Sequence, residues 1–367
     1  MSSLNSKRRR SVLPALASLI CWCGSLGALV FSALGISAFV APDFWFTDNM
    51  SFFLRQFLAA GLLGCAAAAL GLLLPHRFAR TYRLMFGLAL VAFAGLTALT
   101  AIRTLENTVE TRIPSGNGLT LKVISINVER LFLGDRRLTR FLEREKPDII
   151  VLQEVMWWLQ ERRWERFELP VGSTGENGFP EFLSVGSAES LVVYSRFPVL
   201  QTTSKIVRGD LHEGASVIYE ADREILEATL DMGDRQLNLV SVHPDSPRDN
   251  TRWQNKRRYF AEVDKSIRDL RYKNTGPLLV IGDWNSAPWS TRFQKTLAEN
   301  NLGTAYPGGW PRTTRFFFDH RLRWILGAPV DQFAVSDDIK VRSVSTGPHV
   351  GSDHLPLIIE IELPAKN

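Results

Sequence analysis

Three short polar strings lie far apart in this chain, and their residue types suit hydrolysis at phosphorus. They are Leu152-Gln153-Glu154, Gly282-Asp283-Trp284-Asn285 and Gly351-Ser352-Asp353-His354. Apolar, β-branched runs precede the first two strings, which predicts that each follows a buried strand. We therefore expect all three to meet at one rim of a sheet. Carboxylates, an amide and an imidazole gathered there would suit metal-assisted cleavage of a phosphate ester.

Within these strings the acidic and amide residues suit different chemical roles. Glu154 offers a hard oxygen ligand of the kind that Mg²⁺ prefers, with Mn²⁺ as the alternative. Asp283 can orient or deprotonate an attacking water. Asn285, two residues further on, can donate to a phosphate oxygen. Each also has a structural interpretation, because Glu154 could cap a helix and the Asp-x-Asn pair could form an ordinary turn.

Two histidines complete the candidate set. His354 beside Asp353 places an imidazole next to a carboxylate, a pairing that suits a general base near neutral pH. His243 ends the strand expected over 237–242 and could donate to the phosphate. An isolated Asp-His pair usually lies on a protein surface, so this interpretation depends on the whole set coming together.

The elements that must position these residues alternate between strands and helices from Leu119 onward. This pattern predicts a mixed-sheet, layered α/β domain over 119–367, preceded by a polar linker over 103–118. The predicted strands are 121–126, 149–152, 191–194, 225–230, 237–242, 278–281, 332–335, 339–344 and 357–361. The predicted helices are 137–144, a Trp-rich 156–167, 252–272 and 291–299.

The segment from about Leu119 to Leu363 resembles the endonuclease/exonuclease/phosphatase superfamily, whose fold is the DNase I-like α/β sandwich. The resemblance rests on motifs that occur in the family's order. They are Ser125-Ile126-Asn127, Leu152-Gln153-Glu154, Glu189 with Tyr194-Ser195-Arg196-Phe197-Pro198, Val242-His243-Pro244, Gly282-Asp283-Trp284-Asn285, Val330-Asp331-Gln332-Phe333 and Gly351-Ser352-Asp353-His354. Gly309-Trp310-Pro311 also resembles a segment of membrane-anchored bacterial members.

The resemblance implies a metal-binding role for Glu154, with Asn127 and Asp353 close to the ion. It also implies that Asp283 and Asn285 hold the nucleophile and the scissile phosphate. Members of this superfamily hydrolyse DNA, RNA, phosphoinositides, sphingomyelin-type lipids and small phosphodiesters, so the motifs leave the substrate open.

The resemblance further implies that His354 is the base and that Asp331 orients it. His243 would contact the phosphate, held by Glu189 as in the nucleases. One residue departs from the family's pattern, because Gln332 stands where many members have histidine. We expect activity to survive this change, since the position varies in the family.

The first part of the chain has a different character, because 12–41, 57–74 and 84–102 contain no charged residue. About twenty apolar residues cross a bilayer, so we expect three transmembrane helices and an anchor over 1–102. A signal peptide is the alternative for the first helix, but its apolar run is too long and lacks a clear cleavage site. Without charges inside the helices, a transport role has no residue to carry it.

The distribution of basic residues around the apolar helices predicts the membrane topology of the anchor. The net charge of the chain is +5, yet 35 of its 43 basic and 36 of its 38 acidic residues follow the anchor. The basic excess flanks the helices at 7–10 and 77–83, which predicts that these ends are cytoplasmic. The third helix would then deliver the catalytic domain to the outer side of the inner membrane. Near-neutral charge on that domain argues against tight binding of duplex DNA.

Three questions stay open at this stage. The substrate could be a nucleic acid or a lipid headgroup, and nothing in the sequence indicates a protein partner. Trp284 and Trp289 could stack on a base or sugar, and the basic, aromatic stretch 312–323 could line a nucleic-acid groove or face the bilayer. A binding module that kept the fold and lost catalysis is the non-enzymatic alternative, which the intact acidic and His residues disfavour.

Overall fold

A computed structural model describes residues 2–73, 79–111, 118–129, 131, 135–155, 184–187, 190–211, 221–274 and 276–363. The chain divides into two compact units. One comprises Met1–Leu105 with Trp289–Thr291, and the other comprises Glu106–Pro288 with Arg292–Asn367.

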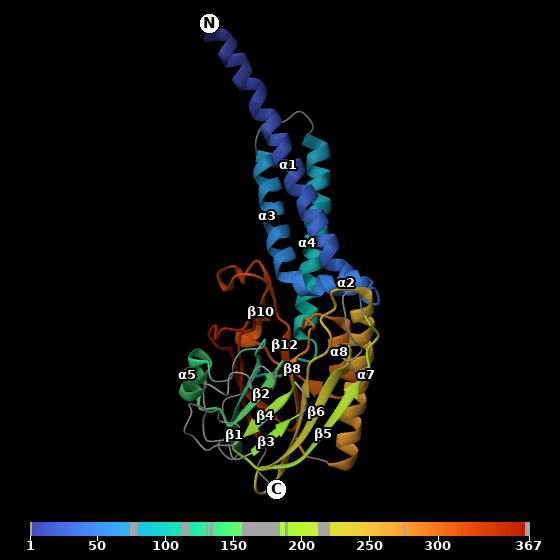
Figure 1. The fold of residues 1–367 in the computed structure, drawn as a ribbon. Helices are drawn as coiled ribbons and strands as arrows, with labels where there is room; N and C mark the ends of the chain where they lie inside the picture. The colour runs from blue at the N-terminus through green and yellow to red at the C-terminus, as the bar shows by residue number, and fades with distance from the viewer. Residues whose placement is uncertain are drawn as a thin grey trace. The chain divides into compact units, whose positions relative to one another are not determined.

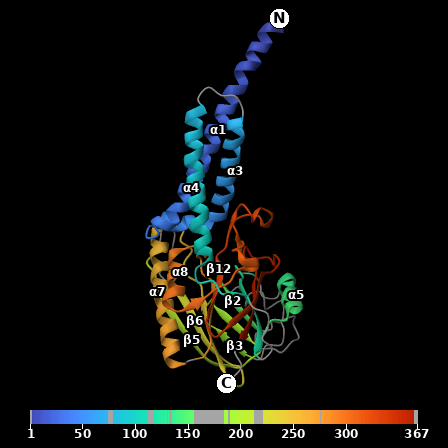
Figure 2. The same cartoon turned by 180° about the vertical axis from the view of Figure 1, so that it is seen from behind.

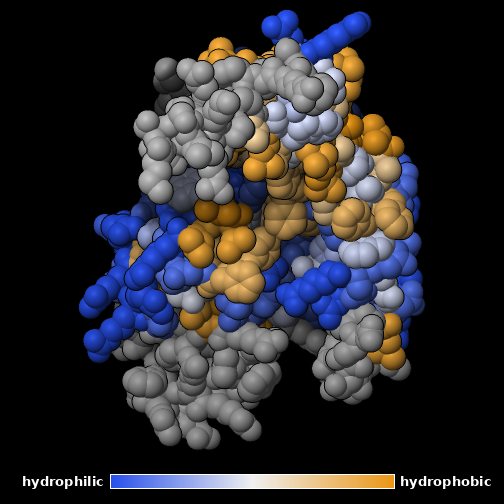
Figure 3. All heavy atoms as spheres, turned by 90° about the horizontal axis from the view of Figure 1, so that it is seen from above, coloured by the Kyte–Doolittle hydropathy of each residue, from blue (hydrophilic) through white to orange (hydrophobic). Residues whose placement is uncertain are grey.

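The first unit is helical and apolar. Its elements are α1 (Ser2–Val40), α2 (Trp45–Met50), the 3₁₀ turn η1 (Ser51–Phe53), α3 (Leu54–Leu73) and α4 (Ala79–Leu105). Three stretches are long and apolar enough to cross a membrane, namely Ala15–Val40, Trp45–Leu73 and Arg80–Leu105. Figure 3 shows apolar side chains, in orange, exposed on the face seen from above. Three candidate spans were expected from the sequence, and the second begins earlier than predicted because α2 and η1 lead directly into α3.

Helices α1 and α3 pack closely through small residues. A Cβ placed on Gly64 would lie 2.7 Å from the carbonyl oxygen of Gly24 and 3.0 Å from the Cβ of Ala28. Only glycine at this position permits such a close approach. Small residues at helix contacts are the usual basis of helix association inside a bilayer, where lipid is as apolar as the side chains.

The second unit contains two six-stranded mixed sheets. The first has the order β13-β14-β1-β2-β4-β3, and the second has the order β5-β6-β7-β8-β12-β9. Only the β1–β2 and β7–β8 pairs are parallel. The bounds in the first sheet are β1 Leu119–Asn127, β2 Ile149–Gln153, β3 Ser184–Ser187, β4 Val192–Ser195, β13 Lys340–Thr346 and β14 Leu357–Leu363. Those in the second are β5 Val199–Val207, β6 Arg223–Asp231, β7 Gln236–Val242, β8 Leu278–Asp283, β9 Leu302–Gly303 and β12 Asp331–Ser336.

The main core lies between the two sheets. Alternate residues of β1 and β2, such as Val123 and Val151, belong to the same buried cluster as Leu239, Ile281 and Phe333 of the second sheet. Because successive side chains of a strand point to opposite faces, the remaining apolar residues face outward and need their own cover.

Helices cover the two outer faces, so the unit has four layers. Helix α5 (Arg136–Glu145) packs Leu138 and Phe141 on the first sheet. Helices α7 (Asn250–Lys273) and α8 (Thr291–Glu299) cover the second sheet. Figures 1 and 2 show α5 on one side of the strands and α7 with α8 on the other. This is the layered α/β sandwich that the sequence predicted.

Side-chain caps fix where these helices begin. Asp135 accepts a hydrogen bond from the backbone of Arg137 at the start of α5, and Asp249 accepts one from Arg252 at the start of α7. Such caps satisfy backbone N–H groups that have no partner inside the helix. The two predicted helices were close to these bounds.

The sequence prediction of the elements needs correction in several places. Strands β3, β5 and β9 were missed, as was the hairpin of β10 (Arg315–Phe316) and β11 (Gly327–Ala328). The predicted linker is partly ordered, because α4 runs to Leu105 and Val109 N donates to Thr304 O at 2.8 Å. The predicted helix over 156–167 lies outside the described residues.

Candidate active site

The predicted site residues come together, but from two sheets and not from one rim. Asn127 ends β1 and Glu154 follows β2 in the first sheet, whereas Asp283 ends β8 in the second. Strand β12 runs antiparallel to β8 and pairs Asp331 with Asp283. His354 lies in the segment that leads into β14. An apolar run marks a buried strand without saying which sheet it joins, and this is why the one-rim prediction was wrong.

Local backbone geometry turns two of these strand ends toward the site. Gly282, at φ +150°, has no space for a Cβ because the carbonyl oxygen of Val242 occupies that position. Glu154 and Asn285 adopt left-handed φ values of 58° and 43° directly after their strands. Non-glycine residues rarely adopt this conformation, and where they do it often marks a functional position.

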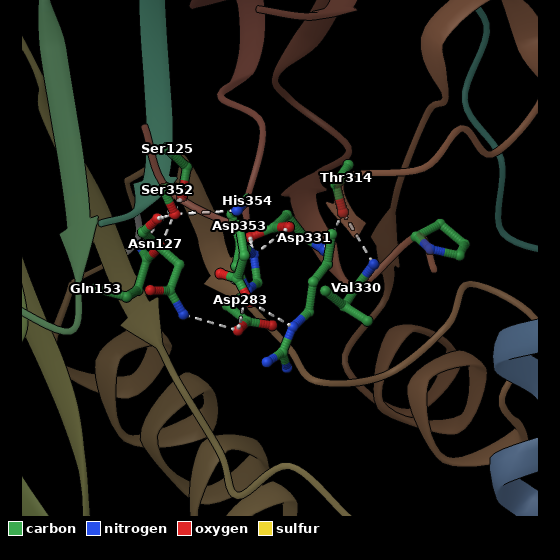
Figure 4. A network of polar contacts seen from close by, with 12 residues as sticks. Ser125, Asn127, Gln153, Asp283, Thr314, Val330, Asp331, Ser352, Asp353 and His354 are labelled. Carbon is green, nitrogen blue, oxygen red and sulfur yellow. Dashed lines mark hydrogen bonds and ion pairs between the residues drawn. The ribbon is translucent and has the colours of Figure 1, made fainter. Parts of the chain in front are cut away.

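Asp283 lies at the centre of the polar network in Figure 4. Its Oδ2 accepts a hydrogen bond from Asn127 Nδ2 at 3.1 Å and lies 3.7 Å from both His243 Nε2 and His354 Nε2. Its Oδ1 accepts from the backbone of Asn285 at 2.8 Å. One buried carboxylate therefore connects both histidines of the site.

His354 and Asp331 form a buried pair. His354 Nδ1 lies 2.9 Å and 3.1 Å from the two carboxylate oxygens of Asp331, and both side chains are 1% exposed. Burial alone would lower the pKa of His354, but the charges of Asp331 and Asp283 and the hydrogen bond to Asp331 raise it to about 9. Asp331 thus holds the ring so that Nε2 faces Asp283.

Glu154 and His243 form a second, more open pair. His243 Nε2 lies 3.3 Å from Glu154 Oε1, with side chains 13% and 30% exposed. Asn127 Nδ2 also donates to Glu154 Oε1 at 2.9 Å. Burial would raise the pKa of Glu154, but the hydrogen bond and charge of His243 and the bond from Asn127 hold that pKa well below its ordinary value. Glu154 is therefore an ionised carboxylate in this arrangement.

Arg315 is a site residue that the motifs did not identify. Its Nε donates to Asp353 Oδ2 at 3.2 Å, and β10 forms a bridge with His354. Burial would lower the pKa of Arg315, but Asp353, Asp283, Glu154 and Asp331 raise it overall. The only sequence signal was its place in the basic, aromatic stretch 312–323. Nothing in that stretch indicated contact with Asp353.

The segment carrying Asp353 is fixed by several hydrogen bonds. Ser352 Oγ donates to the carbonyl of Asn127 at 2.7 Å and accepts from the backbone of His354 at 3.0 Å. Asp353 N donates to Glu129 Oε2 at 2.9 Å. These bonds tie the segment to the end of β1 in its own sheet, and the contact of His354 with Asp331 then joins it to β12 of the second sheet.

A family model described as the endonuclease/exonuclease/phosphatase family matches residues 124–354, which include this whole network. The chain belongs to that family. Its members are phosphoester hydrolases that generally use divalent metal ions. A comparison with curated protein sequences found no match.

Solved structures of family proteins are similar to the chain at low sequence identity. An endonuclease/exonuclease/phosphatase from Beutenbergia cavernae shares 19% identity over 66% of this chain and 72% of its own, with a TM-score of 0.47. The human nocturnin catalytic domain shares 17% over 66% and 95%, with a TM-score of 0.44. Sphingomyelinase C from Streptomyces griseocarneus shares 16% over 67% and 100%, with a TM-score of 0.43.

The donor chemistry fits the divalent cation that the family uses. Ligand atoms of Asp283, Asp331 and His354 lie within 4.8 Å of one another. The ionised Glu154 belongs to the same cluster, because Asn127 Nδ2 donates both to Glu154 Oε1 and to Asp283 Oδ2. Asp353 Oδ1 is buried and has no hydrogen bond to any described residue. Carboxylate oxygens gathered in this way suit a hard divalent cation.

Two amides are placed differently from the family expectation. Asn127 presents its NH₂ to the carboxylates while its oxygen accepts from Glu129 N at 3.0 Å, so it would bind a metal only after the amide rotates by half a turn. Asn285 Nδ2 donates to the carbonyl of Pro244 at 3.0 Å. That bond joins the end of β8 to the segment that follows His243.

The remaining predicted residues either lie outside the described part of the chain or are buried in the core. Glu189 and the Trp-rich helix lie outside the described residues. The sequence left open whether Trp284 and Trp289 stack on a base or sugar, and their exposed fractions of 1% and 0% place both in the core. Trp284 instead packs edge-on against Phe293 and donates from Nε1 to Gln332 O at 3.0 Å. Trp284 is therefore a core residue next to the site and not a substrate contact.

Proposed function

We propose that this family member is a membrane-anchored, Mg²⁺-dependent phosphoesterase that cleaves a phosphodiester or phosphomonoester by in-line attack of water. One observation carries the proposal: buried His354, aligned by Asp331, directs Nε2 toward Asp283. An imidazole held by one carboxylate and facing a second can accept a proton from a water bound between them.

The residues have the following proposed roles. His354 accepts the proton of the attacking water, and Asp331 orients the ring and stabilises the imidazolium that forms. Asp283 positions the water through the oxygen that faces both histidines. His243, Asn285 and Arg315 donate to oxygens of the phosphoryl group. Several preorganised donors aimed at developing charge are worth more than the same donors in water.

Glu154 and Asp353 would hold the metal, with Asn127 as a third ligand through its amide oxygen. A divalent cation bound there supplies positive charge that stabilises the developing negative charge on the phosphoryl oxygens. Mg²⁺ fits the oxygen donors best, and Mn²⁺ is the alternative. Glu189 keeps its proposed role of holding His243.

The helical unit would serve as a multi-pass anchor in the inner membrane, with the catalytic unit on the outer side. The basic clusters at 7–10 and 77–83 support this topology through the positive-inside rule. A C-terminal alkaline phosphatase fusion should be active and a cytoplasmic reporter fusion inactive. The reverse pattern would overturn the topology and leave the chemistry untouched.

Turnover of a generic phosphodiester by the full-length protein tests the enzymatic proposal. Bis-p-nitrophenyl phosphate should be hydrolysed with Mg²⁺ and not with EDTA, and Asp283→Ala and His354→Ala should abolish turnover. Asp234→Ala, in the exposed β6–β7 turn, is a matched control that should retain it. Equal activity in the wild type and in all these variants would overturn the proposed site, and a wild type without Mg²⁺-dependent turnover would favour the degenerate binding module.

A further inference from the structure

The connection between β10 and β11 exposes large apolar side chains in the described part of the catalytic unit. Phe318 is 81% exposed, Ile325 67% and Trp324 58%. Phe317 and Leu322 on the same loop are 40% and 45% exposed. Single exposed apolar residues are ordinary on a soluble surface, but a cluster on one short loop indicates a binding surface. We define the β10–β11 loop as residues 317–326.

Several backbone groups of this loop are paired within the loop itself. Phe317 N donates to Leu326 O, Leu322 N to Asp319 O, and Leu326 N to Leu322 O at 2.8 Å. Asp319 also caps the short turn η4 (His320–Leu322). A loop that enters an apolar medium must pair its polar backbone internally, since each unpaired group there is costly. These internal hydrogen bonds therefore lower the free-energy cost of moving the loop from water into an apolar medium.

The polar residues of the loop suit a bilayer interface in particular. Arg321 and Arg323 outnumber the single acid, Asp319. The Arg323 guanidinium lies over the Trp324 ring, 4.9 Å from its centroid. Tryptophan beside arginine, with phenylalanine and leucine, is the composition that proteins place at the level of lipid headgroups. A site for one protein partner would not require the net positive charge.

The chain itself keeps this unit close to a membrane. The last candidate span ends at Leu105, and Asn107 Nδ2 already donates to Gln294 Oε1 at 2.8 Å within the catalytic unit. So short a connection limits how far the unit can move from the bilayer surface. A bilayer is therefore the partner that the loop meets at the highest local concentration.

We infer that the β10–β11 loop inserts its apolar side chains into the bilayer interface. It thereby presents the active site to phosphate groups of lipids in the same membrane. The base of the hairpin is built into the site, because Arg315 binds Asp353, and Phe316 N donates to Asp353 O at 3.0 Å. Leu355 N also donates to Thr314 O at 2.6 Å. The choice of a lipid phosphate ester as substrate class rests on the proposed catalytic function, whereas insertion of the loop rests only on the proposed membrane anchor.

Membrane depth of the loop tests the insertion directly. The full-length protein, with Cys21, Cys23 and Cys65 replaced by alanine, would carry one nitroxide label in nanodiscs of phosphatidylcholine and phosphatidylglycerol. The label at Phe318→Cys should be more accessible to oxygen than to a water-soluble nickel complex. The matched control is Tyr272→Cys at the end of α7, where the side chain is 93% exposed, and it should show the reverse. Equal, aqueous accessibility at both positions would overturn the insertion.

A substrate comparison tests the lipid assignment. Combined Phe318→Ser and Trp324→Ser should lower hydrolysis of vesicle phospholipid by ~10-fold or more, since each aromatic loses most of its favourable burial. Hydrolysis of bis-p-nitrophenyl phosphate should not change. An equal loss on both substrates would assign the loop to the fold of the site and overturn the lipid inference. If the wild type hydrolyses neither substrate, the proposed function fails and the depth measurement still decides the insertion.

Discussion

The site contains two imidazole–carboxylate pairs that share one carboxylate neighbour, Asp283, and differ in almost everything else. His354 and Asp331 are 1% exposed and joined at 2.9 Å. His243 and Glu154 are 13% and 30% exposed and joined at 3.3 Å. The first pair is a rigid, desolvated unit, whereas the second opens toward solvent.

From this difference we infer that the two pairs have different functions. A buried pair has a fixed ring orientation and a strongly shifted pKa, which suits proton transfer. An open pair can exchange ligands and reach an incoming phosphate or metal. If this division is correct, variants of the buried pair should affect the chemical step, and variants of the open pair should affect binding of the metal and the substrate.

Among the variants that test this division, Asp331→Asn should have the largest effect. The amide cannot stabilise the imidazolium of His354 and favours the wrong tautomer, so kcat should fall by ~10²- to 10⁴-fold. Additional Mg²⁺ should not restore it. Steady-state kinetics against Mg²⁺ concentration measure this. A variant with normal kcat and a raised Mg²⁺ requirement would place Asp331 among the metal ligands instead.

Glu154→Gln should have a smaller and different effect. Loss of the charged oxygen should raise the Mg²⁺ concentration for half-maximal activity by ~10- to 100-fold, as expected for a weakened metal site. High Mg²⁺ should restore much of the rate. Glu143→Gln, at an exposed position of α5, serves as a control of the same chemistry and should leave the Mg²⁺ dependence unchanged. An irreversible loss of rate in Glu154→Gln would contradict the proposed division.

Much of this comparison could be predicted from sequence, because strands and motifs are local. Buried runs such as 278–281 mark a strand by composition alone, and the residues that follow them are fixed by chain order. The predicted strand over 332–335 placed Asp331 at a strand end in the same way. Family resemblance then supplied the pairing of Asp331 with His354, which spacing alone could not give.

The rest depends on contacts that composition does not encode. Strand β5 was missed because its residues alternate between exposed and partly buried positions at a sheet edge, with little apolar signal. Arg315 was missed because its role comes from pairing of β10 with the segment around His354. The role of Trp284 and Trp289 stayed open because a large aromatic residue near a motif has the same sequence pattern whether it packs in the core or faces a substrate.

Titration of His354 should show how the buried pair responds to metal. In EDTA its pKa should lie near 9, above the ordinary 6.5, because the surrounding carboxylates favour the imidazolium. The neutral base forms only as the pH rises through the pKa of His354, so activity measured with Mg²⁺ should increase with pH through the metal-shifted value. Mg²⁺ should lower the pKa by a pH unit or more through charge repulsion, worth ~1.4 kcal/mol per unit.

Nuclear magnetic resonance of histidine-labelled protein, with and without Mg²⁺, measures this shift. Asp331→Asn should move the metal-free pKa back toward 6.5. The same shift has a consequence for folding in EDTA. The stabilisation from His354 is complete below about pH 6.5 and is lost as the pH rises through about 9. If the His354 pKa changes neither on addition of Mg²⁺ nor in Asp331→Asn, the assignment of His354 and Asp331 as the proton-transfer pair is contradicted.

The smallest effect should come from Arg315→Lys, which tests whether the guanidinium beside Asp353 binds the phosphoryl group. Lysine keeps the charge beside Asp353 but loses the planar set of donors. We therefore expect kcat/KM to fall by about fivefold to tenfold, on the order of 1 kcal/mol, with the His354 pKa nearly unchanged. Arg312→Lys, exposed on the same segment, should behave as wild type. A larger loss in Arg315→Lys, together with a displaced His354 pKa, would show that Arg315 acts by positioning Asp353 and not by binding phosphate.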